Sequence, residues 1–437
     1  MVKKVAIVGA GPCGVLLAHY LLRRGDSYQI DIYERRSDPR IVSFSKSRTF
    51  PLSLNERGMN ALSQIPELAE AVRAVSVEMT GSIFHPKNGK AKSRPRKKPL
   101  ITLDRTNLVI VLLEKLTEKY PQSRLNIHFD CQCTQVDFEA KTVSFQTHPP
   151  AEEAVFTVSY DLLIGADGAH STVRKHLLTT NTFECEQKPI ANDYKSIFLP
   201  PPDGNSEINL EMGKIHAWRL GANTTILLLH DRDGSMSGVI HFPRNNNQIS
   251  GLSTPQEVLK FFQDNFPEVG KLMPESEAEA FLTRPISTII TVRCSRYHYQ
   301  GSVLLIGDAA HAVSPSIGQG CNAALEDVSL FNSLLDEYSD NLAVAVEQFT
   351  VRREADAHAL VELSDYSFPS SKNLLIEFAL RQTFAKILHQ IFPKFFSPTL
   401  FELISESTVP YSEILNSYQG WIAKVKKSQE KLLGINS

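Results

Sequence analysis

The chain has 437 residues, 42% of them hydrophobic and 22% charged, which is typical of a globular protein with two or three structural modules. A net charge of −2 and a pI near 6.7 argue against a nucleic-acid-binding surface over the whole molecule. Six scattered cysteines offer neither a disulfide framework nor metal-ligand spacing, and they favour a reducing, cytoplasmic setting. With no apolar run of about 18 residues, the sequence also predicts no membrane-spanning helix.

The first elements along the chain read as strand, turn, helix and strand. An apolar run over residues 5–8 enters a glycine turn at 9–14, a helix follows over 15–24, and a second strand covers 30–33. We read the N-terminal apolar run as this first strand and not as a signal peptide. The pattern predicts a βαβ unit, and therefore a parallel sheet covered by helices.

The next part of the chain mixes helices and strands. Helix-like stretches lie around 59–75, and a helix capped by Asp104 is expected over 103–119. Between them, the basic run at 85–99 is broken by prolines, which predicts a loop. Residues 126–145 read as strand, turn, strand.

The second half of the chain changes its pattern twice. Over 195–290, alternating runs are separated by Gly, Asn and Asp, as in an antiparallel sheet, and a parallel-sheet strand returns at 303–306. After about residue 345 the chain reads as helical. We therefore expect a discontinuous nucleotide-binding domain (1–75, 101–180 and 290–345), an inserted β-sheet domain (76–100 and 181–289) and a C-terminal helical region (346–437).

The glycine turn carries a dinucleotide-binding fingerprint. Gly9 permits the tight turn, Gly11 lets backbone approach a pyrophosphate, and Gly14 lets the helix pack on the strand. Glu34, 20 residues after Gly14, can accept hydrogen bonds from ribose hydroxyls. Arg35 is either an NADP phosphate contact or a solvated loop residue. The candidate cofactor contacts here are Gly9, Gly11, Pro12, Cys13, Gly14, Tyr33, Glu34 and Arg35.

Two later segments indicate which dinucleotide cofactor the chain binds. Residues 160–174 run from a strand through Asp167-Gly168 into a helix, and residues 301–322 run from a strand through Gly307-Asp308 to a Gly-rich turn that opens a helix. Together with the fingerprint, they resemble the flavin-dependent aromatic hydroxylases of the para-hydroxybenzoate hydroxylase class. The resemblance implies an α/β fold: a Rossmann-type FAD-binding domain with an inserted antiparallel β-sheet substrate domain and C-terminal helices.

The same resemblance implies roles for individual residues. Asp308 would hold the ribityl hydroxyls of FAD, Arg105 would reach the ribityl-phosphate region, and Asp167 would touch both the FAD and the NAD(P)H side. The N–H groups of a helix N-terminus would stabilise the negative charge of reduced flavin. The residues expected at that turn are Pro315, Gly318, Gly320, Cys321 and Asn322.

Longer stretches are most similar to the kynurenine 3-monooxygenase family, including its helical tail. This likeness implies that Arg48 and Ser53 border the flavin and that Cys133 lies near the adenosine. Several of the residues at the positions where the family binds its substrate differ from those of the family. Where that family has an arginine for the substrate carboxylate this chain has Ser82, and the partner tyrosine's position falls near Arg96.

The remaining substrate-pocket candidates are weaker. The family's tail-helix asparagine aligns with Ser367, while its last tyrosine is retained as Tyr411. His216, Trp218 and Tyr366 are further candidates, and for each the competing interpretation is plain packing in a sheet or helix. A carboxylate needs a charge-assisted, bidentate partner. Kynurenine is therefore not the expected substrate.

The resemblance implies an FAD-dependent, NAD(P)H-consuming monooxygenase. One oxygen atom of O₂ would enter an aromatic or other electron-rich small molecule through a flavin C4a-hydroperoxide. Because the flavin carries the chemistry, we assign no catalytic acid or base from the sequence. Alternatives are a reductase or dehydrogenase on the same fold, a kynurenine 3-monooxygenase whose carboxylate site is rebuilt from the 87–98 run, and a non-enzymatic FAD-binding scaffold. We expect the helical tail to pack over the active site, with weak membrane contact as the alternative.

Overall fold

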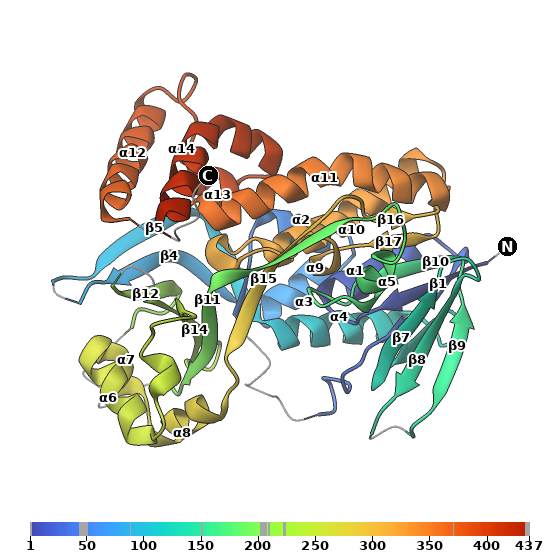
Figure 1. Ribbon diagram of the computed structural model, residues 1–437, viewed down its shortest axis with the longest axis horizontal. Coiled ribbons are helices and arrows are strands. Elements are labelled where there is room, and N and C mark those ends of the chain that lie inside the picture. Colours follow the sequence, from blue (N-terminus) through green and yellow to red (C-terminus); the bar gives the residue numbers. More distant parts are fainter. Residues whose placement is uncertain are drawn as a thin grey trace.

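Three β-sheets organise the part of the chain that the structure describes. The structure is a computed structural model, and it describes residues 2–42, 51–87, 89–149, 152–201, 208, 210–221, 224–369 and 371–432. A parallel sheet and a small antiparallel sheet lie toward one end of the molecule, and the largest sheet lies toward the other (Figure 1).

The six-stranded sheet is the predicted nucleotide-binding sheet. β1 lies at its centre and pairs in parallel with both β2 and β10, which confirms the βαβ opening. β17 extends it in parallel, as expected, and the short β16 adds an antiparallel edge. In spatial order its strands are β16 (His298–Tyr299), β17 (Val303–Leu305), β10 (Leu162–Gly165), β1 (Lys3–Val8), β2 (Tyr28–Tyr33) and β6 (Leu125–His128).

The eight-stranded sheet combines strands from distant parts of the chain. Its β11 to β14 segment is antiparallel as predicted, but β12 pairs in parallel with β4. In spatial order its strands are β15 (Ser287–Cys294), β11 (Cys185–Leu199), β14 (Met236–Pro243), β13 (Thr224–His230), β12 (Lys214–Leu220), β4 (Val77–His85), β5 (Lys92–Asp104) and β3 (Pro51–Leu54).

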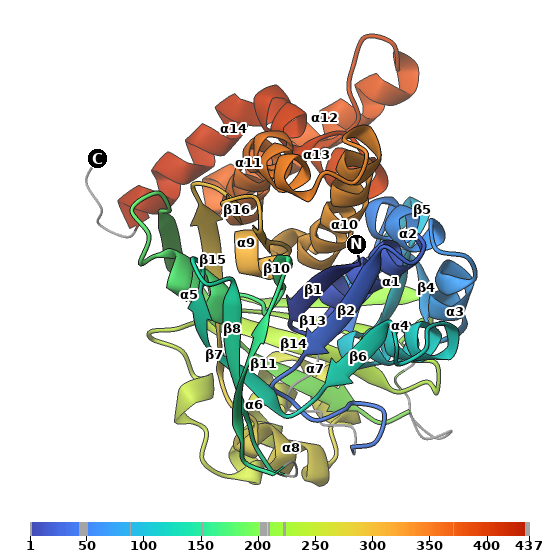
Figure 2. The same cartoon turned by 90° about the vertical axis from the view of Figure 1, so that its right-hand side faces the viewer.

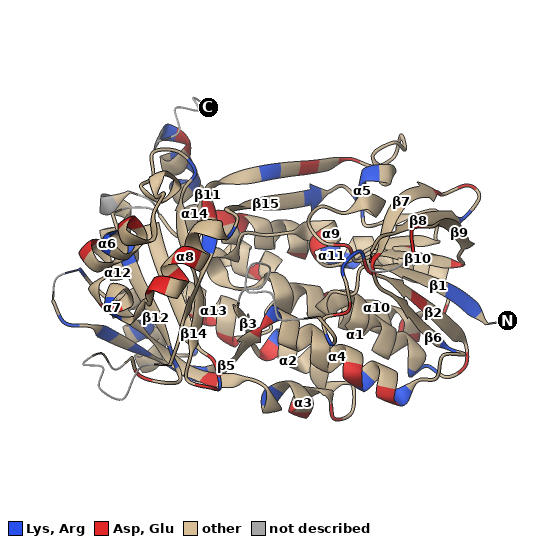
Figure 3. Cartoon of the chain, turned by 90° about the horizontal axis from the view of Figure 1, so that it is seen from below, with Lys and Arg blue, Asp and Glu red and all other residues tan. Residues whose placement is uncertain are grey.

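The basic run at 85–99 is not a loop, so that prediction was wrong. Its residues from Lys92 onward belong to β5, which pairs with β4 in an antiparallel hairpin carrying Lys and Arg side chains (Figure 3). Pro95 lies opposite Gly81, next to a register shift, where an irregular ladder tolerates a missing N–H donor. Pairing with β4 outweighs the local turn signals.

The third sheet and the helices complete the layers. The small sheet contains β7 (Cys131–Asp137), β8 (Thr142–Thr147) and β9 (Val155–Ser159). The helices around the nucleotide-binding part are α1 (Pro12–Leu22), α2 (Glu56–Ser63), α3 (Leu68–Ala74), α4 (Arg105–Lys119), α5 (Thr172–Leu177), α9 (Asp308–His311) and α10 (Gly320–Glu337). Asp104 caps α4 by accepting a hydrogen bond from Thr106 N–H, as predicted.

The remaining helices cover the two faces of the eight-stranded sheet. Figure 1 and Figure 2 both place the C-terminal helices on one side and α6 to α8 on the other. The first group is α11 (Leu342–Tyr366), α12 (Lys372–Ile391), α13 (Leu400–Glu406) and α14 (Tyr411–Leu432). The second is α6 (Pro255–Asn265), α7 (Pro267–Leu272) and α8 (Glu275–Thr283); short 3₁₀ turns span Ile249–Gly251 and Pro315–Ile317.

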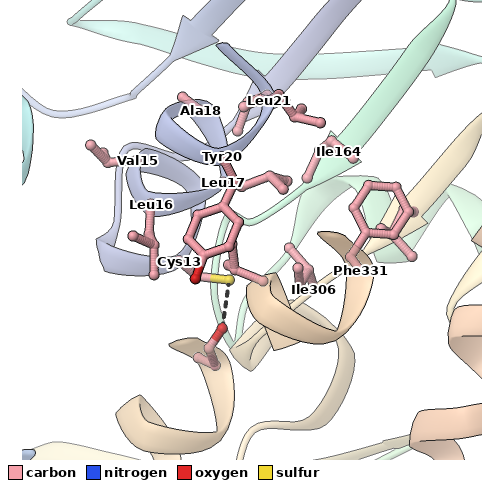
Figure 4. Close-up of a cluster of buried hydrophobic side chains, with 14 of the residues drawn as sticks. Cys13, Val15, Leu16, Leu17, Ala18, Tyr20, Leu21, Ile164, Ile306 and Phe331 are labelled. Carbon is pink, nitrogen blue, oxygen red and sulfur yellow. Dashed lines mark hydrogen bonds between the residues drawn. The ribbon is translucent and has the colours of Figure 1, made fainter. Parts of the chain in front are cut away.

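The largest hydrophobic core fixes α1 between the parallel sheet and α10. The α1 residues from Cys13 to Leu22 are all buried, against strand residues such as Ile164 and the α10 residue Phe331 (Figure 4). Cys13 Sγ also donates a hydrogen bond to Ala324 O of α10, at 3.1 Å. The two helices that begin at predicted cofactor turns are therefore packed directly on one another.

Candidate functional site

The fingerprint glycines are required by close backbone approach. Gly9 has φ +108°, and a Cβ there would lie 2.4 Å from Ala166 O. A Cβ on Gly14 would lie 2.2 Å from Gly9 O. The turn can pack this tightly against α1 and against the segment that follows β10 only because both residues lack side chains.

The N-terminus of α1 is open to a ligand on its polar side. Its N-cap residue, Gly11, provides no side-chain cap, so helix N–H groups remain available to an anion. A Cβ on Gly11 would lie 3.9 Å from Arg105 Nη2, with no closer atom among the described residues other than its chain neighbours. Arg105 begins α4, so its guanidinium lies beside the turn as expected. Glu34 also reaches the turn, because its Oε2 accepts a hydrogen bond from Ala10 N–H at 3.0 Å.

The second open helix N-terminus belongs to α10. Its N-cap residue, Gln319, gives no side-chain cap, and Gly318 before it has φ +65°. Asn322 links this turn to the segment around β3. Its Nδ2 donates a hydrogen bond to Ser53 O at 2.9 Å, and its Oδ1 accepts one from Asn55 N–H at 2.9 Å. Asn322 is fully buried, so its side chain holds the turn instead of facing a ligand.

Asp308 lies where the two glycine turns meet. It is exposed although its neighbours in the chain are buried, so its carboxylate is accessible to a ligand. A Cβ on Gly320 would lie 4.0 Å from Asp308 Oδ1, and a Cβ on Gly307 would lie 3.3 Å from Cys13 Sγ. Burial, with Asp308 nearby, raises the pKa of Cys321 to about 12. Fingerprint, acid and α10 turn therefore form one continuous site.

Asp167 has one buried carboxylate oxygen without a hydrogen-bond partner among the described residues. Its Oδ2 accepts a hydrogen bond from Thr172 N–H at 2.6 Å, which is a helix-capping role. Its Oδ1 is buried and accepts no hydrogen bond from the described residues. Burial raises the pKa of this carboxyl group despite the N–H donors, and the nearby Asp167 charge also raises the pKa of the buried Cys133. An additional donor from a cofactor would satisfy Oδ1.

The other predicted cofactor residues have varied surroundings. Tyr33 is buried in a stack with Phe145, whose ring centroid lies 3.8 Å away, whereas Arg35 is exposed. Pro315 begins a 3₁₀ turn before the α10 turn. Pro12 occupies the first turn of α1, where its missing N–H is tolerated. Arg48 lies outside the described residues.

A buried ion network missed by the sequence analysis supports the Asp308 turn. Asp327 Oδ2 accepts a hydrogen bond from Gly307 N–H at 2.9 Å and lies 2.6 Å from His311 Nε2. Its Oδ1 lies 2.6 Å from Arg353 Nε, and Arg353 Nη1 lies 2.9 Å from Glu326 Oε2. Burial alone would raise the pKa of Asp327, but His311 and Arg353 lower it. Asp327 and Arg353 follow Asp308 by 19 and 45 residues and belong to no recognised motif, so the sequence analysis could not identify them.

Tyr411 joins the C-terminal helices to the same turn. It is fully buried, and its hydroxyl donates a hydrogen bond to Gln319 Oε1 at 3.0 Å. The guanidinium of Arg57 lies over its ring, 4.1 Å from the centroid, and also donates to Val409 O. The predicted tyrosine is therefore beside the α10 turn.

Two predicted substrate residues pack elsewhere. His216 lies opposite Ile83 in the β12–β4 ladder, while Ile215 lies opposite Ser82, so His216 and Ser82 face opposite sides of the sheet. Trp218 belongs to the core under α6 to α8, and its Nε1 donates to Glu268 Oε2 at 3.1 Å. Strand alternation therefore places His216 and Trp218 on the face of the sheet away from the C-terminal helices.

The β4–β5 hairpin faces the C-terminal helices through Arg96. Its Nη2 donates to Ser405 Oγ at 3.0 Å and lies 3.7 Å from Glu406 Oε1. Burial lowers the pKa of Arg96, as expected for a partly desolvated guanidinium. Ser82, on the neighbouring strand, is half-buried. The basic residue at the aligned tyrosine position is thus already paired with α13.

The last two candidates lie where α11 ends. Ser367 is fully buried, and its Oγ has no hydrogen-bond partner among the described residues. Its carbonyl accepts a hydrogen bond from Trp421 Nε1 at 3.3 Å. Tyr366 is half-buried, with Lys426 Nζ 5.3 Å from its ring centroid. Of these two residues, Ser367 has a side-chain hydroxyl group without a hydrogen-bond partner among the described residues.

The nucleotide-binding sheet, its three cofactor segments and the large sheet beside them define a flavoprotein hydroxylase of the para-hydroxybenzoate hydroxylase type. The profile of the FAD binding domain family matches residues 3–362. Kynurenine 3-monooxygenase of Caenorhabditis elegans is 32% identical over 98% of this chain and 93% of its own length. The Sus scrofa enzyme is 30% identical over 96% and 87%. The chain therefore belongs to the FAD-dependent monooxygenase family that includes the kynurenine 3-monooxygenases.

Solved structures agree on the fold. A 2-methyl-3-hydroxypyridine-5-carboxylic acid oxygenase superposes with a TM-score of 0.65 at 19% identity, covering 88% of this chain and 93% of that one. A tetracycline destructase gives 0.61 at 18% identity, with 87% and 95% covered. The protein is an FAD-dependent class A monooxygenase that uses NAD(P)H and O₂ on a small molecule, as predicted. This finding sets aside the reductase and scaffold alternatives.

Among the described residues, no helix is both long enough and apolar enough to cross a membrane.

Proposed function

We propose that the residues around the two glycine turns hold FAD in the roles expected from the sequence. Bound FAD supplies the redox chemistry, taking electrons from NAD(P)H and activating O₂. The α1 N-terminus and Arg105 neutralise the pyrophosphate, and Glu34 accepts from the ribose hydroxyls. Asp308 accepts from the ribityl hydroxyls, and the α10 N-terminus stabilises negative charge on the reduced ring. The orphaned Asp167 Oδ1 supports this assignment.

We further propose that the substrate is an aromatic or similarly electron-rich molecule other than L-kynurenine. The observation that carries this proposal is the pairing of Arg96 and Lys97 of the hairpin with α13. Arg96 contacts Ser405 and Glu406 of α13. Ser82 stands at the position where the sequence resemblance leads us to expect an arginine for a substrate carboxylate. The same hairpin pairs Lys97 with Glu402 at 3.0 Å.

The energetic argument follows from these pairings. A desolvated carboxylate without its partner costs roughly 3–5 kcal/mol, which is a few hundred-fold or more in affinity. Ser82 can donate one hydrogen bond but cannot neutralise a charge. Moving Arg96 to a substrate carboxylate would break its existing contacts with α13. The free energy lost there would offset part of the free energy gained from the new ion pair.

The test compares hydroxylation of L-kynurenine by the wild type and by Ser82→Arg. We expect poor turnover in the wild type and a lower KM in the variant. Thr80→Arg, on the same face of β4 and outside the aligned position, is the control for adding a charge. Efficient wild-type turnover at micromolar kynurenine would disprove the substrate proposal and leave the monooxygenase class untouched.

We also propose a membrane-surface role for α12, because one observation favours it. Five apolar residues of α12 are exposed by 45–63% and recur at helical spacing, which favours the alternative of weak membrane contact for this stripe. They are Ile376, Leu380, Phe384, Ile387 and Ile391. Exposed Arg381, Lys386 and Lys394 flank them, a combination typical of helices that lie on anionic bilayers.

Vesicle flotation tests the α12 proposal. The wild type should float with vesicles containing anionic lipid, and Leu380→Asp with Phe384→Asp should abolish flotation while leaving the FAD content unchanged. A double Asp substitution at exposed Gln263 and Lys271 on α6 and α7 is the matched control. Wild-type protein that stays at the bottom of the gradient would refute the membrane role.

Two organisational expectations remain proposals. We propose the division into FAD-binding residues 1–75, 101–180 and 290–345, substrate-domain residues 76–100 and 181–289, and the helical region 346–437; the layering of the sheets supports it. We propose a cytoplasmic setting, supported by six cysteines that are all free thiols.

A further inference from the structure

Cys185 and Cys294 lie directly opposite each other on β11 and β15. They are register partners in the antiparallel ladder, and their Sγ atoms are 3.6 Å apart. The adjacent pair is joined by a backbone hydrogen bond from Ser295 N–H to Glu184 O, at 2.9 Å. Because hydrogen-bonded and non-hydrogen-bonded pairs alternate, the two cysteines occupy the pair whose side chains approach more closely.

The two strands are the covalent connections of a large insert. β11 leads from the nucleotide-binding part into the eight-stranded sheet, and β15 leads back, as Figure 1 shows. The cysteines lie at the nucleotide-binding end of both strands. Two residues beyond Cys185, the Gln187 side chain accepts a hydrogen bond from Arg174, which also donates to Ala309 O at 2.8 Å. Ala309 follows Asp308, so the pair lies close to the cofactor turn.

The two thiols differ in reactivity. Cys185 is half-buried and therefore reachable by a small oxidant, whereas Cys294 is 1% exposed. The hydrogen bond from Cys294, together with the nearby Arg174 charge, lowers the pKa of Cys185 to about 7, although burial opposes the shift. The same contact and burial raise the pKa of Cys294. Cys185 is the nucleophile of the pair, because thiolates and not thiols attack oxidants.

We propose that Cys185 and Cys294 form an oxidation-sensitive modification site that closes to a disulfide with hydrogen peroxide as the oxidant. The Cys185 thiolate attacks one peroxide oxygen and the O–O bond breaks; the departing hydroxide takes up the proton that the Cys185 thiol released, so a sulfenic acid and one water result. Cys294 sulfur then attacks the sulfenic sulfur, an S–S bond forms, and the hydroxyl group leaves with the Cys294 thiol proton as a second water. The two sulfurs lose two electrons, and the peroxide gains them.

The bond would lock the insert at its base. It would close a loop containing most of the eight-stranded sheet and α6 to α8, and long closed loops lose the most unfolded-state entropy. Oxidation should therefore raise the melting temperature by several degrees. Because no flavin chemistry enters these steps, this inference is independent of the proposed substrate and of the proposed FAD contacts.

The experiment treats the holoenzyme with a small molar excess of hydrogen peroxide and counts thiols after denaturation. We expect six reactive thiols before treatment and four after it, a mass decrease of two hydrogens, and one linked peptide pair containing Cys185 and Cys294. Dithiothreitol should restore all six. Wild-type protein that keeps six thiols, or a link between other cysteines, would overturn the proposal.

Three variants make the test specific. Cys131→Ser is the matched control, since Cys131 is a buried strand cysteine outside the pair, and this variant should still lose two thiols. Cys185→Ser should lose none. Cys294→Ser should accumulate a sulfenic acid on Cys185 that dimedone traps. If Cys294→Ser does not fold, Cys185→Ser decides the question: thiol loss that persists in that variant contradicts the assignment.

Discussion

Tyr411 donates a hydrogen bond from its hydroxyl to Oε1 of Gln319, at 3.0 Å, and so ties the first turn of α14 to the residue that precedes α10. Asn55 Nδ2 donates to the same oxygen, also at 3.0 Å. Three distant segments of the chain therefore meet at one amide group. The C-terminal helices are therefore coupled to the α10 turn, which we propose faces the flavin.

Tyr411→Phe should loosen the α10 turn. Removing this hydroxyl should lower the free energy of unfolding by about 1 kcal/mol, and a less firmly held turn should raise the fraction of NAD(P)H consumption that ends as peroxide. Tyr418→Phe is the matched control, because that hydroxyl on the same helix donates to Pro398 O at 2.9 Å. Equal peroxide yields in the two variants would mean that the Tyr411 bond is merely structural.

Asp308→Ala should weaken FAD retention. The purified wild type should be yellow with one non-covalently bound FAD, and loss of two charge-assisted hydrogen bonds should weaken binding by about 2–4 kcal/mol. Fluorescence quenching during FAD titration of the apoprotein measures this change. Asp264→Ala, at an exposed position on α6, should bind like the wild type. Unchanged affinity in Asp308→Ala would remove this residue from the cofactor site.

Asp327→Asn should destabilise the whole Asp308 turn. The substitution removes the carboxylate beside Arg353 Nε and weakens the acceptor of Gly307 N–H, while Glu326 still pairs with Arg353. The expected loss in unfolding free energy is roughly 1.5–3 kcal/mol, as for a buried hydrogen bond to a charged group. Denaturant unfolding with FAD release as a second probe measures both effects. Asp336→Asn, an exposed acid near the end of the same helix, is the control and should cost less than about 1 kcal/mol. A small effect at Asp327 would contradict the supporting role of the network.

His19 should make stability sensitive to mild acid. Burial lowers its pKa to about 4, although a hydrogen bond with Leu112 O opposes the shift, and an unfolded histidine titrates near 6.5. As the pH falls, His19 in the unfolded state therefore takes up a proton before His19 in the folded state does. The stabilisation is complete above about pH 6.5 and is lost as the pH falls toward about 4.

Substituting His19 with Gln tests this dependence. Between pH 7 and pH 5, the wild type should lose about 2 kcal/mol more stability than His19→Gln, because glutamine does not titrate. His148→Gln, outside the α1–α4 contact, should follow the wild type. Parallel pH profiles for the wild type and His19→Gln would show that this histidine does not contribute.

The sequence by itself determined the cofactor half of the protein. A Cβ on Gly14 would meet Gly9 O within the same βαβ unit, and the Asp104 cap acts on its own helix. Such requirements are local: a positive φ, a helix cap or an apolar strand is set by residues within a few positions. For that reason the parallel sheet and the α/β class were predictable from the chain.

Only the tertiary structure decided which distant residues meet. The basic run became β5 because β4 pairs with it, and the β12–β4 register turned His216 away from Ser82. Neither the Tyr411–Gln319 contact nor the Cys185–Cys294 pair leaves a local pattern. The face that a strand residue occupies depends on register with a remote partner, and a shift of one residue would reverse it.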